Sequence, residues 1–214
     1  MKNKLFQIAL AAILCATLWS CEKVTKTDDG WVDLGLPSGL LWASCNVGAE
    51  NPQDYGDYFA WGETKPKANY TEASYNCRDI YDGSNDWANK LFSIDDAATV
   101  NIGAPARMPT KEDFEELYNC CESEWISYKG KNGRIFKGPN GNSIFLPAAG
   151  ELSNTSLKNV DKYGNYWSSN GGGTSEYWYE NLAMYLFFNE DFFTTDAHRR
   201  WTGQSVRPVK EYTD

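Results

Sequence analysis

The sequence predicts a single α+β domain in which strands dominate, and three observations support this prediction. The chain has 214 residues, the length of one ordinary domain. With 42% hydrophobic and 23% charged residues, it can bury a core and does not have the composition of a disordered chain. Short apolar runs alternate with Gly, Asn and Pro turns, and only one segment has a clear helical period.

The first twenty residues are typical of an export signal. After two lysines, residues 5–18 form an apolar run that has the length of a signal-peptide core and is too short to span a membrane comfortably. The run ends at Leu18-Trp19-Ser20-Cys21, which resembles the motif at which bacterial lipoproteins are cleaved and acylated on cysteine. We therefore interpret residues 1–20 as a lipoprotein signal peptide and Cys21 as the acylated residue. A plain secretory signal is the alternative.

Residues 21–29 are polar and lack periodicity, so we expect a flexible tether before a domain that spans residues 30–214. The formal net charge of −9 argues against nucleic acid as a partner, because phosphates need a basic face. An acidic surface is not attracted to anionic lipid either. Membrane contact is therefore expected through the lipid anchor only.

Export also permits disulfides. Adjacent cysteines close a ring only with strain, so Cys45 and Cys77 would each pair with one of the neighbours Cys120 and Cys121. The alternative is that the thiols stay reduced as small buried side chains.

Residues 31–46 are predicted to form a β-hairpin, because two apolar runs, 31–36 and 40–44, flank the turn sequence Pro37-Ser38-Gly39. The following residues, 47–101, are rich in Asp, Asn, Tyr and Gly and have little regular period. They are expected to form long surface loops held in place by aromatic side chains.

The clearest local prediction is a helix over residues 111–121. Thr110 is an N-cap candidate with Asp113 three residues later, and acidic residues occupy the first turn, where the helix dipole favours them. One apolar stripe then follows at helical spacing. It consists of Phe114, Leu117, Tyr118 and Cys121.

Strands are predicted beyond this helix. Residues 134–137 and 143–146 flank a Gly-Pro-Asn-Gly turn, which indicates a second hairpin. Residues 182–188 alternate in the manner of a strand, with Met184 and Phe188 on the face expected to be buried. The opposite face of this strand would be free to meet a ligand.

Six phrases, in order along residues 31–209, together resemble the Fibrobacter succinogenes major paralogous domain family of surface proteins from Bacteroides-type bacteria. They are WVDLGLPSG at 31–39, DYGDYFAWGE at 54–63, RMPT at 107–110, LPAAG at 146–150, YWSS at 166–169 and SVRPV at 205–209. The resemblance implies a C-type-lectin-like fold, with a twisted antiparallel sheet, one or two helices and long loops that display a variable surface.

The resemblance also implies roles for particular side chains. Arg107 and Arg207 fall within the family phrases and are expected to be internal hydrogen-bond centres rather than catalysts. Buried tryptophans would hold the loops of such a fold. The tryptophans assigned to this structural role are Trp42, Trp61, Trp87, Trp125 and Trp167.

The expected recognition surface is the stretch 163–201, where twelve of thirty-nine residues are aromatic, against 15% for the whole chain. Flat rings pack on sugar C–H faces or on protein side chains, while amide, carboxylate and guanidinium groups recognise polar edges. The expected ligand contacts are Tyr177, Trp178, Tyr179, Tyr185, Asp191, His198, Arg199 and Trp201.

Catalysis is not expected. His198 is the only histidine, which excludes a metal site built from several imidazoles and leaves one candidate base for a Ser–His–Asp arrangement. Because it lies beside two arginines, a surface or ligand contact is the favoured interpretation. We therefore expect no catalytic residue, no metal site and no cofactor. A calcium ion held by the Asp- and Asn-rich loops is the alternative retained.

Taken together, these features predict an adhesin: a ligand-binding module anchored in the cell envelope, on the outer-membrane surface. Its ligand would be a glycan or a protein on a host or neighbouring cell. The alternative is a structural accessory subunit of a surface assembly such as a pilus tip.

Overall fold

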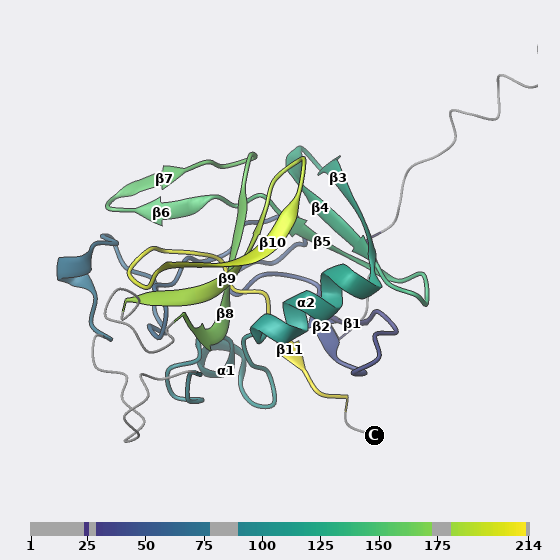
Figure 1. The fold of residues 1–214 in the computed structure, drawn as a ribbon, viewed down its shortest axis with the longest axis horizontal. Helices are drawn as coiled ribbons and strands as arrows, with labels where there is room; N and C mark the ends of the chain where they lie inside the picture. Colours follow the sequence, from purple (N-terminus) through teal and green to yellow (C-terminus); the bar gives the residue numbers. More distant parts are fainter. Residues whose placement is uncertain (1–23, 26–28, 78–89, 173–180, 213–214) are drawn as a thin grey trace, which may run out of the picture.

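The computed structural model describes residues 24–25, 29–77, 90–172 and 181–212 (Figure 1). The elements, in chain order, are β1 (Trp31–Asp33), β2 (Leu41–Ala43), the 3-10 helix η1 (Glu72–Ser74), α1 (Ala97–Ile102), α2 (Lys111–Cys120), β3 (Glu122–Tyr128), β4 (Lys131–Lys137), β5 (Ser143–Pro147), β6 (Glu151–Ser153), β7 (Ser156–Lys158), β8 (Gly164–Gly171), β9 (Leu182–Phe188), β10 (Phe193–Arg199) and β11 (Val209–Lys210). The predicted α+β class is confirmed. No helix of the described part of the chain is long and apolar enough to cross a membrane.

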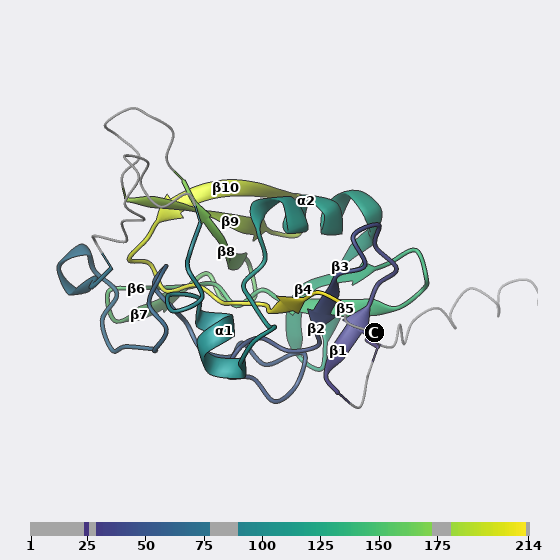
Figure 2. The same ribbon diagram turned by 90° about the horizontal axis from the view of Figure 1, so that it is seen from below.

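The strands of these described segments form small antiparallel sheets. Three sheets have three strands each, in the orders β1-β2-β11, β3-β4-β5 and β10-β9-β8, and β6 pairs with β7. Helix α2 packs on the β8–β9–β10 sheet, and α1 lies on the opposite side of the molecule (Figure 2).

The first predicted hairpin is confirmed, with strands shorter than the apolar runs. Val32 of β1 lies opposite Trp42 of β2, and both side chains are fully buried. Strand β11 pairs on the other side of β2, where Val209 lies opposite Trp42. The end of the folded region is thereby hydrogen-bonded to its beginning.

Helix α2 confirms the predicted helix and ends one residue earlier than expected. The Thr110 hydroxyl oxygen accepts a hydrogen bond from the Asp113 backbone N–H at 3.1 Å, and the Asp113 carboxylate accepts one from the Thr110 N–H at 2.7 Å. This capping box satisfies backbone donors that the first turn leaves without intrahelical partners. Phe114 and Leu117 are fully buried, in one core with Trp42.

The second predicted hairpin is also confirmed, as β4 and β5, and β3 extends it to a three-stranded sheet. Lys129 and Gly130 connect β3 to β4, and both have positive φ angles, 48° and 81°. Positive φ at both central residues is typical of a two-residue β-hairpin turn. Strand β3 was not predicted, because its exposed and half-buried residues give no regular apolar alternation.

Strand β9 differs from the prediction that only one of its faces is buried. Leu186 and Phe188 belong to the core under α2, whereas Ala183 and Tyr185 belong to a second core on the other face. The Phe188 ring packs directly on the backbone of Gly164, at the start of β8. A Cβ atom at this position would lie 2.0 Å from the ring, so only glycine leaves room for it. The face expected to be free is therefore largely covered at its centre.

The long segment before α1 is held by aromatic side chains, as expected. The hydroxyls of Tyr58 and Tyr75 donate to the carbonyls of Ala149 and Trp61, at 2.6 and 2.7 Å. Trp42, Trp61 and Trp167 are fully buried, and Trp125 packs half-buried against the core under α2. Trp87 lies outside the described residues.

Of the two arginines expected to be internal hydrogen-bond centres, Arg207 is one, whereas Arg107 is only half-buried and one of its two carboxylate partners is exposed. Arg207 is fully buried, and its guanidinium donates four hydrogen bonds of 2.8–3.0 Å. The acceptors are Asn46 Oδ1 and the carbonyls of Ala43, Ser44 and Phe145. Arg107 donates to the carboxylates of Asp113 and Glu211.

Within the described residues, neither disulfide pairing is formed. Each of the four cysteines is a half-buried free thiol; they are Cys45, Cys77, Cys120 and Cys121. Burial raises the pKa of Cys77 to about 11 and that of Cys121 to about 12.

Part of the expected tether is docked on the domain. Thr25 donates from its backbone N–H to the Ser143 carbonyl at 3.0 Å, and its hydroxyl accepts from the Ser143 N–H at 2.9 Å. Val24 is 4% exposed and packs against Ile135 and Phe145. The docked positions of Val24 and Thr25 differ from the expectation that residues 21–29 form a flexible tether.

Candidate ligand-binding face

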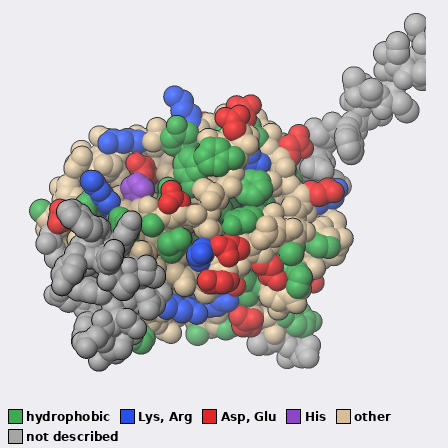
Figure 3. All heavy atoms as spheres, in the orientation of Figure 1, with side chains coloured by type: hydrophobic (Ala, Val, Ile, Leu, Met, Phe, Trp, Pro, Cys, Tyr) green, Lys and Arg blue, Asp and Glu red, His purple; other side chains and the backbone are tan. Residues whose placement is uncertain are grey.

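Three aromatic rings form an exposed row beside β9, which we name the aromatic ridge. The centroids of the Tyr163 and Phe187 rings are 5.4 Å apart, and those of Phe187 and Phe192 are 5.5 Å apart. Tyr163 is 37% exposed and Phe192 is 51% exposed. Figure 3 shows hydrophobic side chains gathered on this face of the molecule. A contiguous exposed apolar patch of this kind is typical of a binding surface.

A hydrogen-bonded turn between β9 and β10 presents Phe192. The Asn189 side chain accepts from the backbone N–H groups of Asp191 and Phe192, at 2.8 and 2.9 Å. Arg134, on β4, donates to the carbonyls of Asn189 and Glu190 from behind the turn. Burial lowers the pKa of Arg134, and these bonds compensate for part of its lost hydration. The exposed ring is thus held on a braced turn.

A polar group adjoins the aromatic ridge. His198 on β10 has its ring 5.5 Å from that of Tyr185, which in turn lies 6.3 Å from the Phe187 ring. The His198 Nε2 atom lies 3.7 Å from the carboxylate of Glu151, on β6. Asp196 is exposed, and its carboxylate accepts from the Ala197 backbone N–H at 2.8 Å. Acidic side chains flank the purple histidine in Figure 3.

The predicted contacts are distributed unevenly around this face. Tyr177, Trp178 and Tyr179 lie outside the described residues. Tyr185 and His198 are in contact, although Tyr185 is only 7% exposed and burial raises its pKa.

The three remaining predicted residues lie at the two ends of the β9–β10 hairpin. Asp191 is exposed and directly precedes Phe192 in the turn. At the other end, Arg199 is exposed and its guanidinium carbon lies 5.6 Å from the centre of the Trp201 ring. Trp201 is half-buried and packs against a core that contains Tyr58. The structure therefore brings Asp191 to the aromatic ridge and places Arg199 and Trp201 apart from it.

Sequence reasoning missed the residues that dominate this face. Tyr163, Phe187 and Phe192 lie in the predicted stretch but were not among the chosen contacts. The alternation of β9 was a usable signal for Phe187, because it places this residue on the face opposite Phe188. Glu151 had no such signal, since β6 lies far from β10 in sequence.

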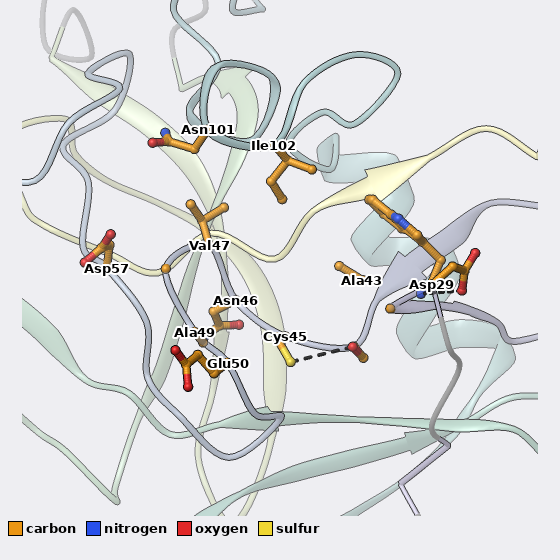
Figure 4. A pocket seen from close by; sticks show the side chains of 14 residues that line it. Asp29, Ala43, Cys45, Asn46, Val47, Ala49, Glu50, Asp57, Asn101 and Ile102 are labelled. Carbon is orange, nitrogen blue, oxygen red and sulfur yellow. Dashed lines mark hydrogen bonds between the residues drawn. The ribbon is translucent and has the colours of Figure 1, made fainter.

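The molecule also has a concave pocket of about 500 Å³ beside the β2 strand (Figure 4). Its carboxylates, on Asp29, Glu50 and Asp57, lie on different sides of the pocket and do not converge on one point. The Cys45 thiol lies 3.6 Å from the Ser44 hydroxyl. Among the described residues, no group of three or more His, Cys, Asp or Glu side chains is placed to hold a metal ion. This pocket has no convergent chemistry that identifies a ligand.

Comparisons with known proteins give no match to a protein-family model, a curated protein or a solved structure.

Proposed function

We propose that the protein is an adhesin, a surface-anchored module that binds a glycan or a protein on a host or neighbouring cell through the aromatic ridge. The observation that carries this proposal is the exposure of Phe192 at 51% on a turn braced by Arg134. Fully burying an exposed phenylalanine side chain is worth about 1.5–3 kcal/mol. Because about half of the Phe192 side chain remains in water, a ligand that covers it would gain roughly half of this free energy, about 0.7–1.5 kcal/mol.

The remaining parts of the proposal come from the sequence. Acylation of Cys21 would hold the domain on the outer-membrane surface of a Bacteroides-type bacterium. The six family phrases support a C-type-lectin-like fold, and the mixed antiparallel architecture with two helices is consistent with it. We propose binding without catalysis.

The test is adhesion of cells that display the protein to host or neighbouring cells, with Phe192→Ser as the variant. Phe92→Ser is a matched control, because Phe92 is 50% exposed and lies in the segment that leads into α1. Helix α1 lies away from the strands β9 and β10 that flank the turn (Figure 1). We expect Phe192→Ser to reduce adhesion about three- to tenfold and Phe92→Ser to leave it unchanged. Equal adhesion by both variants and the parent protein would contradict the proposal.

The same pair of variants tests the alternative function. If Phe192→Ser leaves cell adhesion unchanged but prevents co-purification with pilus subunits, the aromatic ridge is an assembly interface. The protein would then be a structural accessory subunit of a surface assembly.

A further inference from the structure

We propose that Glu151 and His198 form a hydroxyl-binding pair beside the aromatic ridge, and that the ligand is therefore a neutral carbohydrate. This inference rests on the proposed function and narrows it from a glycan or a protein to one ligand class. It also adds Glu151, on β6, to the residues that would contact the ligand.

The spacing of the pair leaves room for a ligand atom. The Glu151 carboxylate and the His198 Nε2 atom are 3.7 Å apart, which is too long for a direct hydrogen bond. The Glu151 side chain is 17% exposed and that of His198 is 33% exposed, so both are accessible from solvent. One hydroxyl oxygen about 2.8 Å from each atom would bridge them.

The hydrogen-bonding character of the pair selects a hydroxyl. An ionised carboxylate only accepts. The His198 Nδ1 atom is buried and has no hydrogen-bond partner among the described residues, so a proton there would be an unsatisfied buried donor. Nε2, which faces Glu151, is therefore the ring nitrogen that can donate to a ligand, and the pair offers one acceptor and one donor. A hydroxyl both donates and accepts through the same oxygen, whereas an ammonium group only donates and a phosphate would be repelled by Glu151.

The surroundings extend the argument from a hydroxyl to a sugar. The Tyr185 ring is only 7% exposed and contacts the rings of both His198 and Phe187, so the aromatic ridge lies one ring away from the polar pair. Sugars combine hydroxyls with apolar C–H faces, which matches this juxtaposition. Asp196 is exposed opposite Tyr185, so a second carboxylate lies beside this face; the cations nearest in sequence or register are Lys158, opposite Glu151 on β7, and Arg199, which lies against Trp201. A ligand hydroxyl at the pair is in direct contact with the Glu151 carboxylate, which favours neutral sugars over acidic ones.

The experiment is an array of neutral and acidic glycans probed with the protein, expressed from the full-length chain, in buffer containing EDTA. We expect saturable binding to neutral glycans, with competition by the free terminal monosaccharide. EDTA would have no effect, because the pair contacts the hydroxyl directly. Loss of binding in EDTA would indicate a cation-mediated contact and would overturn the proposal.

Four variants test the pair itself. Glu151→Leu and His198→Phe should each weaken glycan binding about tenfold or more, since each removes a hydrogen bond to the ligand. His198→Gln should retain most of the binding, because its amide nitrogen reaches the position of Nε2. Glu124→Leu is the matched control, since it makes the same charge change at an exposed residue of β3, outside the pair and outside the turn that presents Phe192. Circular dichroism and thermal melting check that each variant is folded.

The outcomes separate this inference from the proposed function. Binding to no glycan, or glycan binding that survives both Glu151→Leu and His198→Phe, would overturn the hydroxyl-binding pair. If Phe192→Ser still abolishes cell adhesion in that case, the proposed adhesin stands with a protein ligand. If Phe192→Ser has no effect either, both proposals fail.

Discussion

Replacing Arg207 should destabilise the protein strongly, and lysine should not rescue it. The guanidinium connects the end of β2 to β5 by donating to four acceptors, and it is fully buried. A lysine keeps the positive charge but has one nitrogen, which cannot occupy the three nitrogen positions that these acceptors require. The comparison between lysine and methionine therefore separates geometry from charge.

The magnitude follows from the acceptors left without partners. Each buried acceptor that loses its donor costs about 1–3 kcal/mol. Four such losses amount to a destabilisation of roughly 4 kcal/mol at the lower bound. Arg207→Met also removes a buried cation, which offsets part of this destabilisation. The charged form is disfavoured there, because burial lowers the pKa of Arg207. We expect net losses of about 3–5 kcal/mol for both Arg207→Met and Arg207→Lys. A domain of ordinary stability, about 5–15 kcal/mol, would then be near its unfolding threshold.

The assay is urea unfolding followed by tryptophan fluorescence, with the free energy of unfolding extrapolated to water. Arg199→Met is the control, because Arg199 is exposed and its replacement should change stability by less than about 0.5 kcal/mol. If the free energy of unfolding of Arg207→Lys lies within about 1 kcal/mol of that of the parent protein, the positive charge alone is sufficient and the argument from guanidinium geometry is refuted.

Two further predictions concern stability. The Asp96 carboxylate accepts from the backbone N–H groups of Thr99 and Met108, so Asp96→Ala should lower the free energy of unfolding by about 1–3 kcal/mol. Asp96→Asn keeps an acceptor oxygen and should cost less in the same urea assay; equal losses would contradict this role. The second prediction is a fall in stability above about pH 9, because burial raises the pKa of Cys77 from 9.0 to about 11 and that of Cys121 from 9.0 to about 12. Their contribution is complete below the unfolded pKa and is lost as pH rises towards the folded values. The urea midpoint should therefore decrease from pH 8 to about pH 10.5, and a constant midpoint would exclude this linkage.

The elements that could be predicted from sequence are those specified by neighbouring residues. Helix α2 has its capping box and its buried stripe within about ten residues, so its position follows from local pattern. The strands that were missed depend on partners distant in the chain. Strand β11 has two residues and exists because Val209 pairs with Trp42. Strand β3 is held by pairing with β4 and has no apolar alternation of its own.

The candidate site could be predicted as a region but not residue by residue. The aromatic content of the C-terminal stretch does not separate surface rings from core rings: Tyr163 and Phe192 are exposed, whereas Tyr166, Trp167 and Phe188 are buried. Tyr185 was chosen as a contact, yet a second core covers its face of β9, and strand alternation cannot reveal a core on both faces. Glu151 lies near His198 because the next residue of β6, Leu152, pairs with Gly203, a few residues beyond β10.

The docking of Val24 and Thr25 on β5 limits how far the domain could move if Cys21 is acylated. Only Glu22 and Lys23 separate Cys21 from Val24, and an extended chain spans at most about 3.6 Å per residue, so the two Cα atoms lie within about 11 Å of each other. A connection this short would hold the domain close to the bilayer, with the β5 side towards the lipid headgroups. The domain would then bind its ligands in a restricted orientation, because it could not rotate freely about a long linker.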